Sequence, residues 1–174
     1  MGPEPIVGLH DLEEALRSTA AVVTAVRAGH FQEKVSDVLD AAISEGVYPV
    51  LAESADVPKP TVATRDIGAV VAQELLSPPR NSEVIDLDSP IYTEREVAEI
   101  LGRVLGRQLG VVTIPGPGWN DTLVGAGFSP EVAEVLVGLY DADERGLLAP
   151  RGDRTVPCDT GLETTLAALV GARA

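Results

Sequence analysis

The chain has 174 residues, enough to bury a continuous core, and we expect one domain spanning residues 1–174. Its net charge of −14 excludes direct nucleic-acid binding, and its short apolar runs, at a mean hydropathy of +0.15, exclude a membrane span. One cysteine and two histidines exclude an internal disulfide and a Cys/His metal cluster. The N-terminus shows no signal peptide, so we expect a cytoplasmic protein.

Amphipathic helices recur along the chain. Apolar residues at the helical spacing i, i+3, i+4, i+7 place one stripe toward a core. Six segments have this spacing: Leu9–Leu16, Val35–Ile43, Ile67–Leu75, Val97–Leu105, Val132–Tyr140 and Leu162–Val170. We therefore predict six helices.

Several of these helices begin with a capping signal. Thr93 with Glu96, and Thr160 with Glu163, have the spacing of a capping box, while Ser129 precedes a proline and an acid. Asp66 precedes the apolar run that begins at Ile67, and we interpret it as an N-cap rather than a catalytic acid.

Short runs rich in β-branched residues lie between the helices and predict strands. These runs are Ala21–Val26, Val47–Leu51, Thr61–Thr64, Glu83–Leu87 and Leu109–Ile114. Because parallel strands need crossover connections, the alternation of strand and helix predicts an α/β fold with a mainly parallel sheet.

A phosphate-binding glycine loop is the feature that the sequence lacks. A doubly wound nucleotide fold normally opens with a strand and a glycine loop, but this chain goes directly from Gly2, Pro3 and Pro5 into a helix. The segment most similar to the glycine motif of dinucleotide-binding folds is Gly125-Ala126-Gly127. It does not follow a predicted strand, so we interpret it as a helix C-cap and a turn. The nucleotide-binding beginning of the fold is therefore expected to be missing.

Three residues are candidates for contact with a ligand. His30 and Phe31 follow a predicted strand at the sheet edge where α/β proteins bind ligands, although His30 has an equally acceptable structural role. Trp119 lies in a loop rich in proline and glycine, where it either closes over an apolar ligand or plugs a small core. His10 and Glu14 lie one turn apart, but a solvated helix start explains this pair better than acid/base chemistry.

Three motifs resemble the NmrA-like branch of atypical short-chain dehydrogenases, also called the NAD(P)H-binding protein family. Residues 22–33 (VVTAVRAGHFQE) resemble its t-x-L-R-x-G-x-F-x-E-N segment, with Lys34 in place of the asparagine. Residues 62–68 (VATRDIG) resemble its v-x-x-R-D-I-g turn, and residues 92–107 resemble its l-T-x-x-E-i-A-x-x-L helix. The match is to the C-terminal portion of that family.

The resemblance implies a partial Rossmann-type fold with a C-terminal helical subdomain, which forms one wall of a substrate cleft. It implies that Ala28, Gly29, His30 and Phe31 border the nicotinamide end of NAD(P)H, and that His30, Phe31 and Trp119 line the cleft. The N-terminal half with the glycine loop has no counterpart here, so we expect weak or no binding of NAD(P)H to this chain alone.

Two functions remain open. The chain is either a truncated, substrate-side fragment of an NAD(P)-dependent oxidoreductase or a non-catalytic binding or regulatory module that acts through protein contacts. No tyrosine has a lysine four residues later, which leaves the enzyme without an evident proton donor. Expected partners are a small molecule and a second copy bound through an unpaired sheet edge.

Overall fold

The computed structural model describes residues 4–173 of the chain, and within this range helices alternate with short strands. The helices are α1 (Glu4–Arg17), η1 (Gln32–Asp37), α2 (Leu39–Ser44), α3 (Thr64–Leu76), α4 (Glu94–Leu105), η2 (Gly116–Gly118), α5 (Trp119–Gly125), α6 (Pro130–Glu144) and α7 (Leu162–Gly171), where η marks a 3₁₀ helix. The strands are β1 (Thr24–Arg27), β2 (His30–Phe31), β3 (Val47–Leu51), β4 (Lys59–Val62), β5 (Glu83–Asp88), β6 (Ile91–Tyr92), β7 (Gly110–Ile114) and β8 (Arg154–Pro157).

Three parallel strands in the order β1-β5-β8 form one sheet. Val26 is in register with Ile85, and Ile85 with Arg154, so β5 is the central strand. The apolar face of α3 packs on this sheet through Val70, in a cluster that includes the fully buried Ile85. The outer edge of β1 has no strand partner among the described residues.

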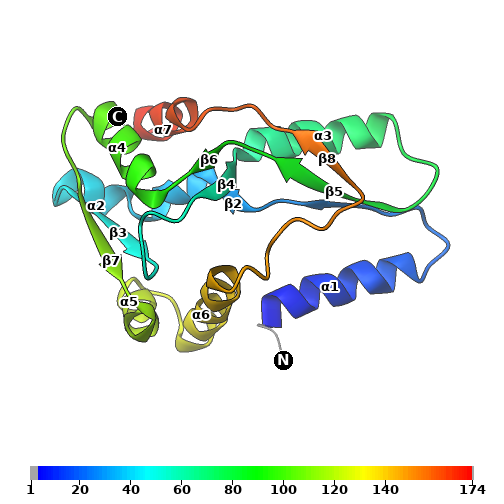
Figure 1. The fold of residues 1–174 in the computed structure, drawn as a ribbon, viewed down its shortest axis with the longest axis horizontal. Coiled ribbons are helices and arrows are strands. Elements are labelled where there is room, and N and C mark those ends of the chain that lie inside the picture. The colour runs from blue at the N-terminus through cyan, green and yellow to red at the C-terminus, as the bar shows by residue number, and fades with distance from the viewer. Residues whose placement is uncertain (1–3, 174) are drawn as a thin grey trace.

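A second core lies beyond this sheet, around the parallel pair β3-β7 and the small sheet β2-β4-β6, in which β6 runs antiparallel. It contains the fully buried side chains of Leu39, Leu101, Leu162 and Leu166, contributed by α2, α4 and α7. Figure 1 shows α3, α4 and α7 on one side of the strands and α1, α5 and α6 on the other. The predicted α/β fold with mainly parallel sheets is confirmed.

The helix prediction is wrong at one place. The segment from Val35 to Ile43 is divided into the 3₁₀ helix η1 and the short helix α2, with Val38 between them at φ −110° and ψ 0°. Apolar spacing alone does not distinguish a continuous helix from two short ones. Helix α5 and the strands β2, β6 and β8 were not predicted, because each is short or carries polar residues.

The capping predictions differ in outcome. Thr93 forms the predicted capping box with Glu96, and Ser129 caps α6 by accepting a hydrogen bond from the amide of Val132. The predictions for Asp66 and Thr160 are wrong: α3 begins at Thr64, before Asp66, and the cap of α7 is Gly161. Instead, the two residues bind each other, since the Asp66 carboxylate accepts hydrogen bonds from Thr160.

Candidate functional site

The segment Ala28–Phe31 directly follows the carboxyl end of β1, as the sequence predicted. The end of β1 is held in place by Arg27, whose guanidinium donates two hydrogen bonds, of 3.0 and 2.6 Å, to the carboxylate of Glu13 on α1. These hydrogen bonds lower the pKa of Glu13. His30 and Phe31 then form β2, which pairs in parallel with β4. The carboxyl end of β1 is therefore fixed from α1 on one side and from β4 on the other.

His30 belongs to a cluster of three polar residues from distant parts of the chain. Its Nε2 lies 3.1 Å from Oδ1 of Asp143, near the end of α6. The other carboxylate oxygen, Oδ2, accepts a hydrogen bond from Nζ of Lys59, at the start of β4. The side chains of Asp143, Lys59 and His30 are 16%, 20% and 33% exposed, so water reaches only part of the cluster.

The charge of Asp143 is stabilised by its two partners. Burial raises the pKa of its carboxyl group, but hydrogen bonds from His30 and Lys59 outweigh burial and lower the pKa to about 2. Asp143 is therefore ionised at neutral pH and fixes the orientation of the His30 ring. No hydrogen bond from the described residues involves the second ring nitrogen of His30, Nδ1, which is therefore available for another contact.

A second polar contact lies one helical turn earlier on α6. Nζ of Lys34, in η1, donates a hydrogen bond of 3.1 Å to the hydroxyl oxygen of Tyr140 and lies 4.6 Å from the centre of the ring. The rings of Tyr140 and of Trp119 in α5 also pack edge to face, with 5.8 Å between ring centres and 87° between ring planes. Tyr140 and Asp143 are three residues apart and therefore share one face of α6.

The predicted site residues have different environments. Phe31 is 46% exposed, whereas Trp119 is only 5% exposed and its indole nitrogen donates a 2.7 Å hydrogen bond to the carbonyl oxygen of Ile114. Ala28 packs against the cluster around Ile85, and a Cβ added to Gly29 would meet the carbonyl oxygen of Pro60 at 3.6 Å. Trp119 thus contributes a buried support for Tyr140, and α6 links Tyr140 to Asp143, the partner of His30.

Four residues of the site were not predicted: Lys34, Lys59, Tyr140 and Asp143. The available signal was composition, because Lys34 and Lys59 are the only two lysines in the chain, and both contact the same face of α6. No tyrosine in the sequence has a lysine four residues later, but the fold brings Lys34 to Tyr140 across 106 residues of the chain.

The remaining candidates lie outside this site. His10 and Glu14 are exposed on α1. Cys158 is buried, and burial, followed by the charge of Asp66, raises the pKa of its thiol. Gly125 ends α5 and Gly127 follows with φ 99°, which fits the predicted turn. The described residues include no group of three side chains suited to a metal ion, and none of their helices is long and apolar enough to cross a membrane.

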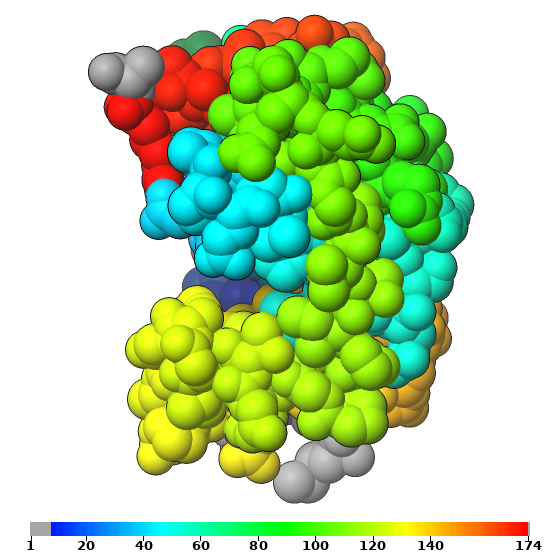
Figure 2. Space-filling view, turned by 90° about the vertical axis from the view of Figure 1, so that its left-hand side faces the viewer, coloured from blue at the N-terminus to red at the C-terminus, as the bar shows by residue number. Residues whose placement is uncertain are grey.

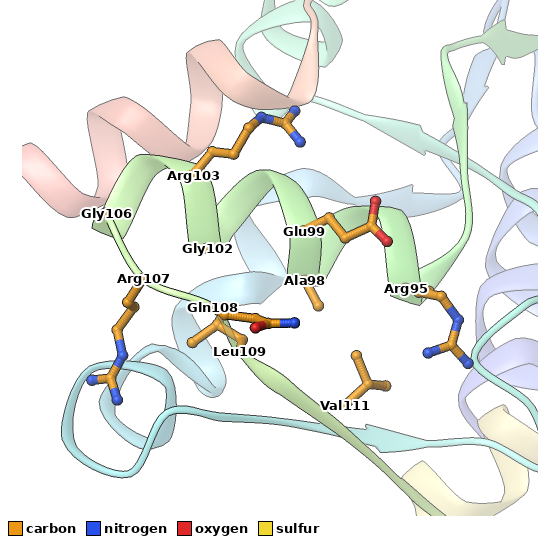
Figure 3. Close-up of a pocket in the computed structure, with 10 residues that line it drawn as sticks. All are labelled: Arg95, Ala98, Glu99, Gly102, Arg103, Gly106, Arg107, Gln108, Leu109 and Val111. Atoms are coloured by element: carbon orange, nitrogen blue, oxygen red, sulfur yellow. The ribbon is translucent and has the colours of Figure 1, made fainter.

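A pocket of about 690 Å³ between α4 and β7 contains none of the predicted site residues. Figure 3 shows that the three arginines around it, Arg95, Arg103 and Arg107, point in different directions. Arg95 binds Asp56, and Arg107 donates a 2.7 Å hydrogen bond to the carbonyl oxygen of Ile43. These guanidinium groups therefore do not converge on a common ligand.

The fold was compared with solved structures. Triphenylmethane reductase from Citrobacter sp. matches with a TM-score of 0.74 and 23% identity, over 91% of this chain and 56% of that one. In its complex with NADP(H), the same reductase matches with a TM-score of 0.64 and 22% identity, over 89% of this chain and 52% of that one. The chain shares the fold of NADP(H)-binding reductases. The resemblance predicted from the sequence is thus confirmed for the fold.

Two further structures support this fold assignment. The NADPH-dependent quinone oxidoreductase of Escherichia coli matches with a TM-score of 0.69 and 19% identity, over 91% of this chain and 57% of that one. A nucleoside-diphosphate-sugar epimerase from Staphylococcus aureus matches with a TM-score of 0.65 and 16% identity, over 90% of this chain and 51% of that one. The chain spans slightly more than half the length of each. No protein-family profile and no curated protein sequence matches the chain.

Proposed function

We propose that this chain forms the substrate-side part of an NAD(P)H-dependent oxidoreductase of the NmrA-like branch. The observation that carries the proposal is the position of Ala28–Phe31, directly after the carboxyl end of β1 and anchored to α6 through His30 and Asp143. Ligands of open α/β sheets bind at the carboxyl ends of the strands. The shared fold with two reductases that were solved with NADP(H) or NADPH supports this interpretation.

The residues of the chain fit one end of the cofactor only. Ala28 has a small side chain and Gly29 has none, and Nδ1 of His30 has no hydrogen-bond partner among the described residues, so this segment can lie against a flat nicotinamide ring. Among the described residues, the unit most similar to a pyrophosphate cradle is β7, the loop Gly116–Gly118 and α5, but it does not fit one. Pro117 lacks an amide donor, and the amide of Gly116 already donates a 2.9 Å hydrogen bond to Glu53. When bound, the nicotinamide would supply a hydride; the chain itself would orient the ring and the substrate.

Nuclear magnetic resonance of the ¹⁵N-labelled chain tests this proposal with nicotinamide mononucleotide, which carries the ring without the adenosine half. We expect chemical-shift changes that are largest at the amides of residues 28–31, with a dissociation constant in the millimolar range. If these amides show no chemical-shift change at a high millimolar concentration of nicotinamide mononucleotide, the proposal is refuted. NADPH should bind no more tightly than nicotinamide mononucleotide, because the chain lacks the contacts to its pyrophosphate. Micromolar binding of NADPH would contradict the proposal that this chain contacts only the nicotinamide end of the cofactor.

A second function is favoured by the open edge of β1. A groove of about 390 Å³ lies beside this edge, and Leu75 and Leu76 at the end of α3 are 77% and 81% exposed. Unpaired strand edges and exposed apolar patches are surfaces at which protein chains associate. A module that acts through protein contacts, including self-association, would use this groove.

Light scattering distinguishes this second function from the first. Self-association through β1 predicts a dimer that Leu75→Glu converts to a monomer, because a carboxylate would be buried in the new interface. Leu9→Glu, on the exposed face of α1, is the matched control, since Leu9 is 65% exposed but lies outside the groove. A chain that is monomeric at every concentration tested would remove the case for self-association.

A further inference from the structure

Lys34 is a cation without an anionic partner in a strongly acidic protein. The sequence contains 27 acidic and 13 basic residues, yet no carboxylate of the described residues lies within 4 Å of Lys34 Nζ. Its recorded hydrogen-bond partner is instead the neutral hydroxyl of Tyr140, at 3.1 Å. The ammonium group therefore retains both its charge and unused N–H donors.

Tyr140 is left with a donor of its own. Its hydroxyl oxygen accepts from Lys34, so its hydrogen must be donated elsewhere, and the described residues provide no acceptor for it. Two donors, one of them charged, are thus adjacent, have no protein acceptor among the described residues, and are open to solvent on the side of Lys34. Paired donors of this kind bind an oxygen anion more strongly than a neutral oxygen.

Nearby groups do not cancel the charge of Lys34. Asp143 lies one turn further along α6, but its two oxygens are already bound to His30 and Lys59. Among the described residues, Lys34 therefore forms no ion pair with a carboxylate.

The contact between Lys34 and Tyr140 joins η1 to α6. Figure 2 shows an indentation of the surface between α2, in cyan, and α6, in yellow, with part of α1 visible at its back. Lys34 belongs to η1, which directly precedes α2, and Tyr140 belongs to α6. The indentation is therefore bordered by α6, which carries Tyr140, and by α2, which directly follows the helix that carries Lys34.

We propose that Lys34 and Tyr140 bind the carboxylate or phenolate oxygen of a small organic anion, and that this anion is the substrate class of the site. The assignment as substrate rests on the proposed oxidoreductase function; the binding itself does not. Lys34 contributes the charge, and Tyr140 contributes a directed hydrogen bond. Trp119 packs edge to face with the Tyr140 ring, and the Asp143 cluster positions α6.

Trp119 is the only tryptophan in the chain, and its ring contact with Tyr140 makes its fluorescence a reporter of binding. Sodium benzoate is the probe and benzamide, which has the same shape without the charge, is its control. We expect saturable binding of benzoate, at least fivefold tighter than binding of benzamide. Equal affinity for the two compounds would overturn the proposal, as would full displacement of benzoate by an equal concentration of chloride.

Two variants assign the binding to the pair. Lys34→Gln and Tyr140→Phe should each weaken benzoate binding at least fivefold, and Tyr140→Phe should do so without loss of the ring contact with Trp119. Arg103→Gln, which removes a cation from α4, is the matched control and should leave the affinity unchanged. Benzoate affinity that is insensitive to both site variants, or equally sensitive to Arg103→Gln, would refute the assignment.

These measurements use no cofactor, so the two proposals fail separately. If benzoate binding requires Lys34 while nicotinamide mononucleotide leaves the amides of residues 28–31 unchanged, the anion site stands and the oxidoreductase function falls. If the opposite result is obtained, the oxidoreductase function stands and the substrate class is wrong.

Discussion

Asp66 and Thr160 are joined by two hydrogen bonds although 94 residues separate them in the chain. Oδ1 of Asp66 accepts from the Thr160 hydroxyl at 2.7 Å, and Oδ2 accepts from the Thr160 amide at 3.1 Å. Asp66 lies in the first turn of α3, where a negative charge is also favoured by the helix dipole. One carboxylate thus connects the beginning of α3 to the loop before α7.

Substitutions at this pair should destabilise the protein in proportion to the number of hydrogen bonds that each one removes. We expect Asp66→Ala to lower the free energy of unfolding by about 2 kcal/mol, because both Thr160 donors lose a charged acceptor. Asp66→Asn, which keeps one acceptor, and Thr160→Val, which keeps the amide donor, should each cost about 1 kcal/mol. Urea unfolding followed by circular dichroism measures all three, and a value for Asp66→Ala below that of Thr160→Val would contradict the two-bond interpretation.

The pKa of Asp143 predicts a loss of stability in acid. Its folded-state pKa of about 2 lies below the ordinary value of 3.8, so ionised Asp143 contributes stability that is present above pH 4 and is lost as the pH falls toward 2. The shift corresponds to about 2 kcal/mol. Asp143→Asn cannot ionise, so the difference in unfolding free energy between wild type and this variant should shrink by that amount between pH 5 and pH 2.

Asp141→Asn is the matched control on the same helix. Asp141 forms an exposed i,i+4 pair with Arg145, with side chains 60% and 65% exposed, and such surface pairs contribute little to stability. The difference in unfolding free energy between wild type and Asp141→Asn should change by no more than about 0.5 kcal/mol between pH 5 and pH 2. If Asp143→Asn behaved in the same way, the carboxylate would not be held by His30 and Lys59.

The two N-caps should differ in strength because their hydrogen bonds differ in length. The amide of Glu96 donates to Thr93 Oγ1 at 3.1 Å, and the Glu96 carboxylate accepts a hydrogen bond from the Thr93 amide at 2.8 Å. Ser129 Oγ accepts from the Val132 amide at the longer distance of 3.4 Å. We expect Thr93→Ala to cost about 1 kcal/mol and Ser129→Ala about half of that. Thermal unfolding of both variants checks the order, and a larger loss for Ser129→Ala would contradict it.

Local patterns predict local structure well in this chain, and tertiary contacts poorly. The spacing of Val97, Leu101 and Leu105, with a capping box before it and Gly106 at φ 67° after it, determines helix α4 without reference to other elements. The strand Val47–Leu51 has the predicted bounds because its β-branched residues lie between polar turns. Such elements need only neighbouring residues to specify them.

The candidate site could be predicted only in part, because its contacts cross the chain. His30 was identified from its position after a strand, but its partner Asp143 is 113 residues away on a helix whose polar face resembles any solvated surface. The same holds for Asp66. Its residue type and position suit an N-cap, but its carboxylate accepts a hydrogen bond from Thr160 instead. A polar side chain near the start of a helix can either cap that helix or bind a residue far away in the chain, and only the tertiary packing decides which contact forms.

Gln32 provides the strongest test of how η1 is anchored to the rest of the fold. Its side chain is 1% exposed, and its amide nitrogen donates to the carbonyl oxygens of Thr61 at 3.2 Å and of Thr160 at 2.8 Å. Its amide oxygen accepts from the hydroxyl of Thr165 at 2.6 Å. One buried amide thus connects η1 with β4, with the loop before α7 and with α7 itself.

Gln32→Leu has a similar volume but leaves these three groups unsatisfied in the interior, so we expect it to lower the free energy of unfolding by about 3 kcal/mol. Thr165→Val removes a single hydroxyl and should cost about 1 kcal/mol. Urea unfolding measures both, and hydrogen exchange at the amides of η1 and α7 locates the loss. If Gln32→Leu were as stable as wild type, apolar packing alone would hold η1 in place. In that case the position of Lys34, two residues later, would not depend on the buried amide.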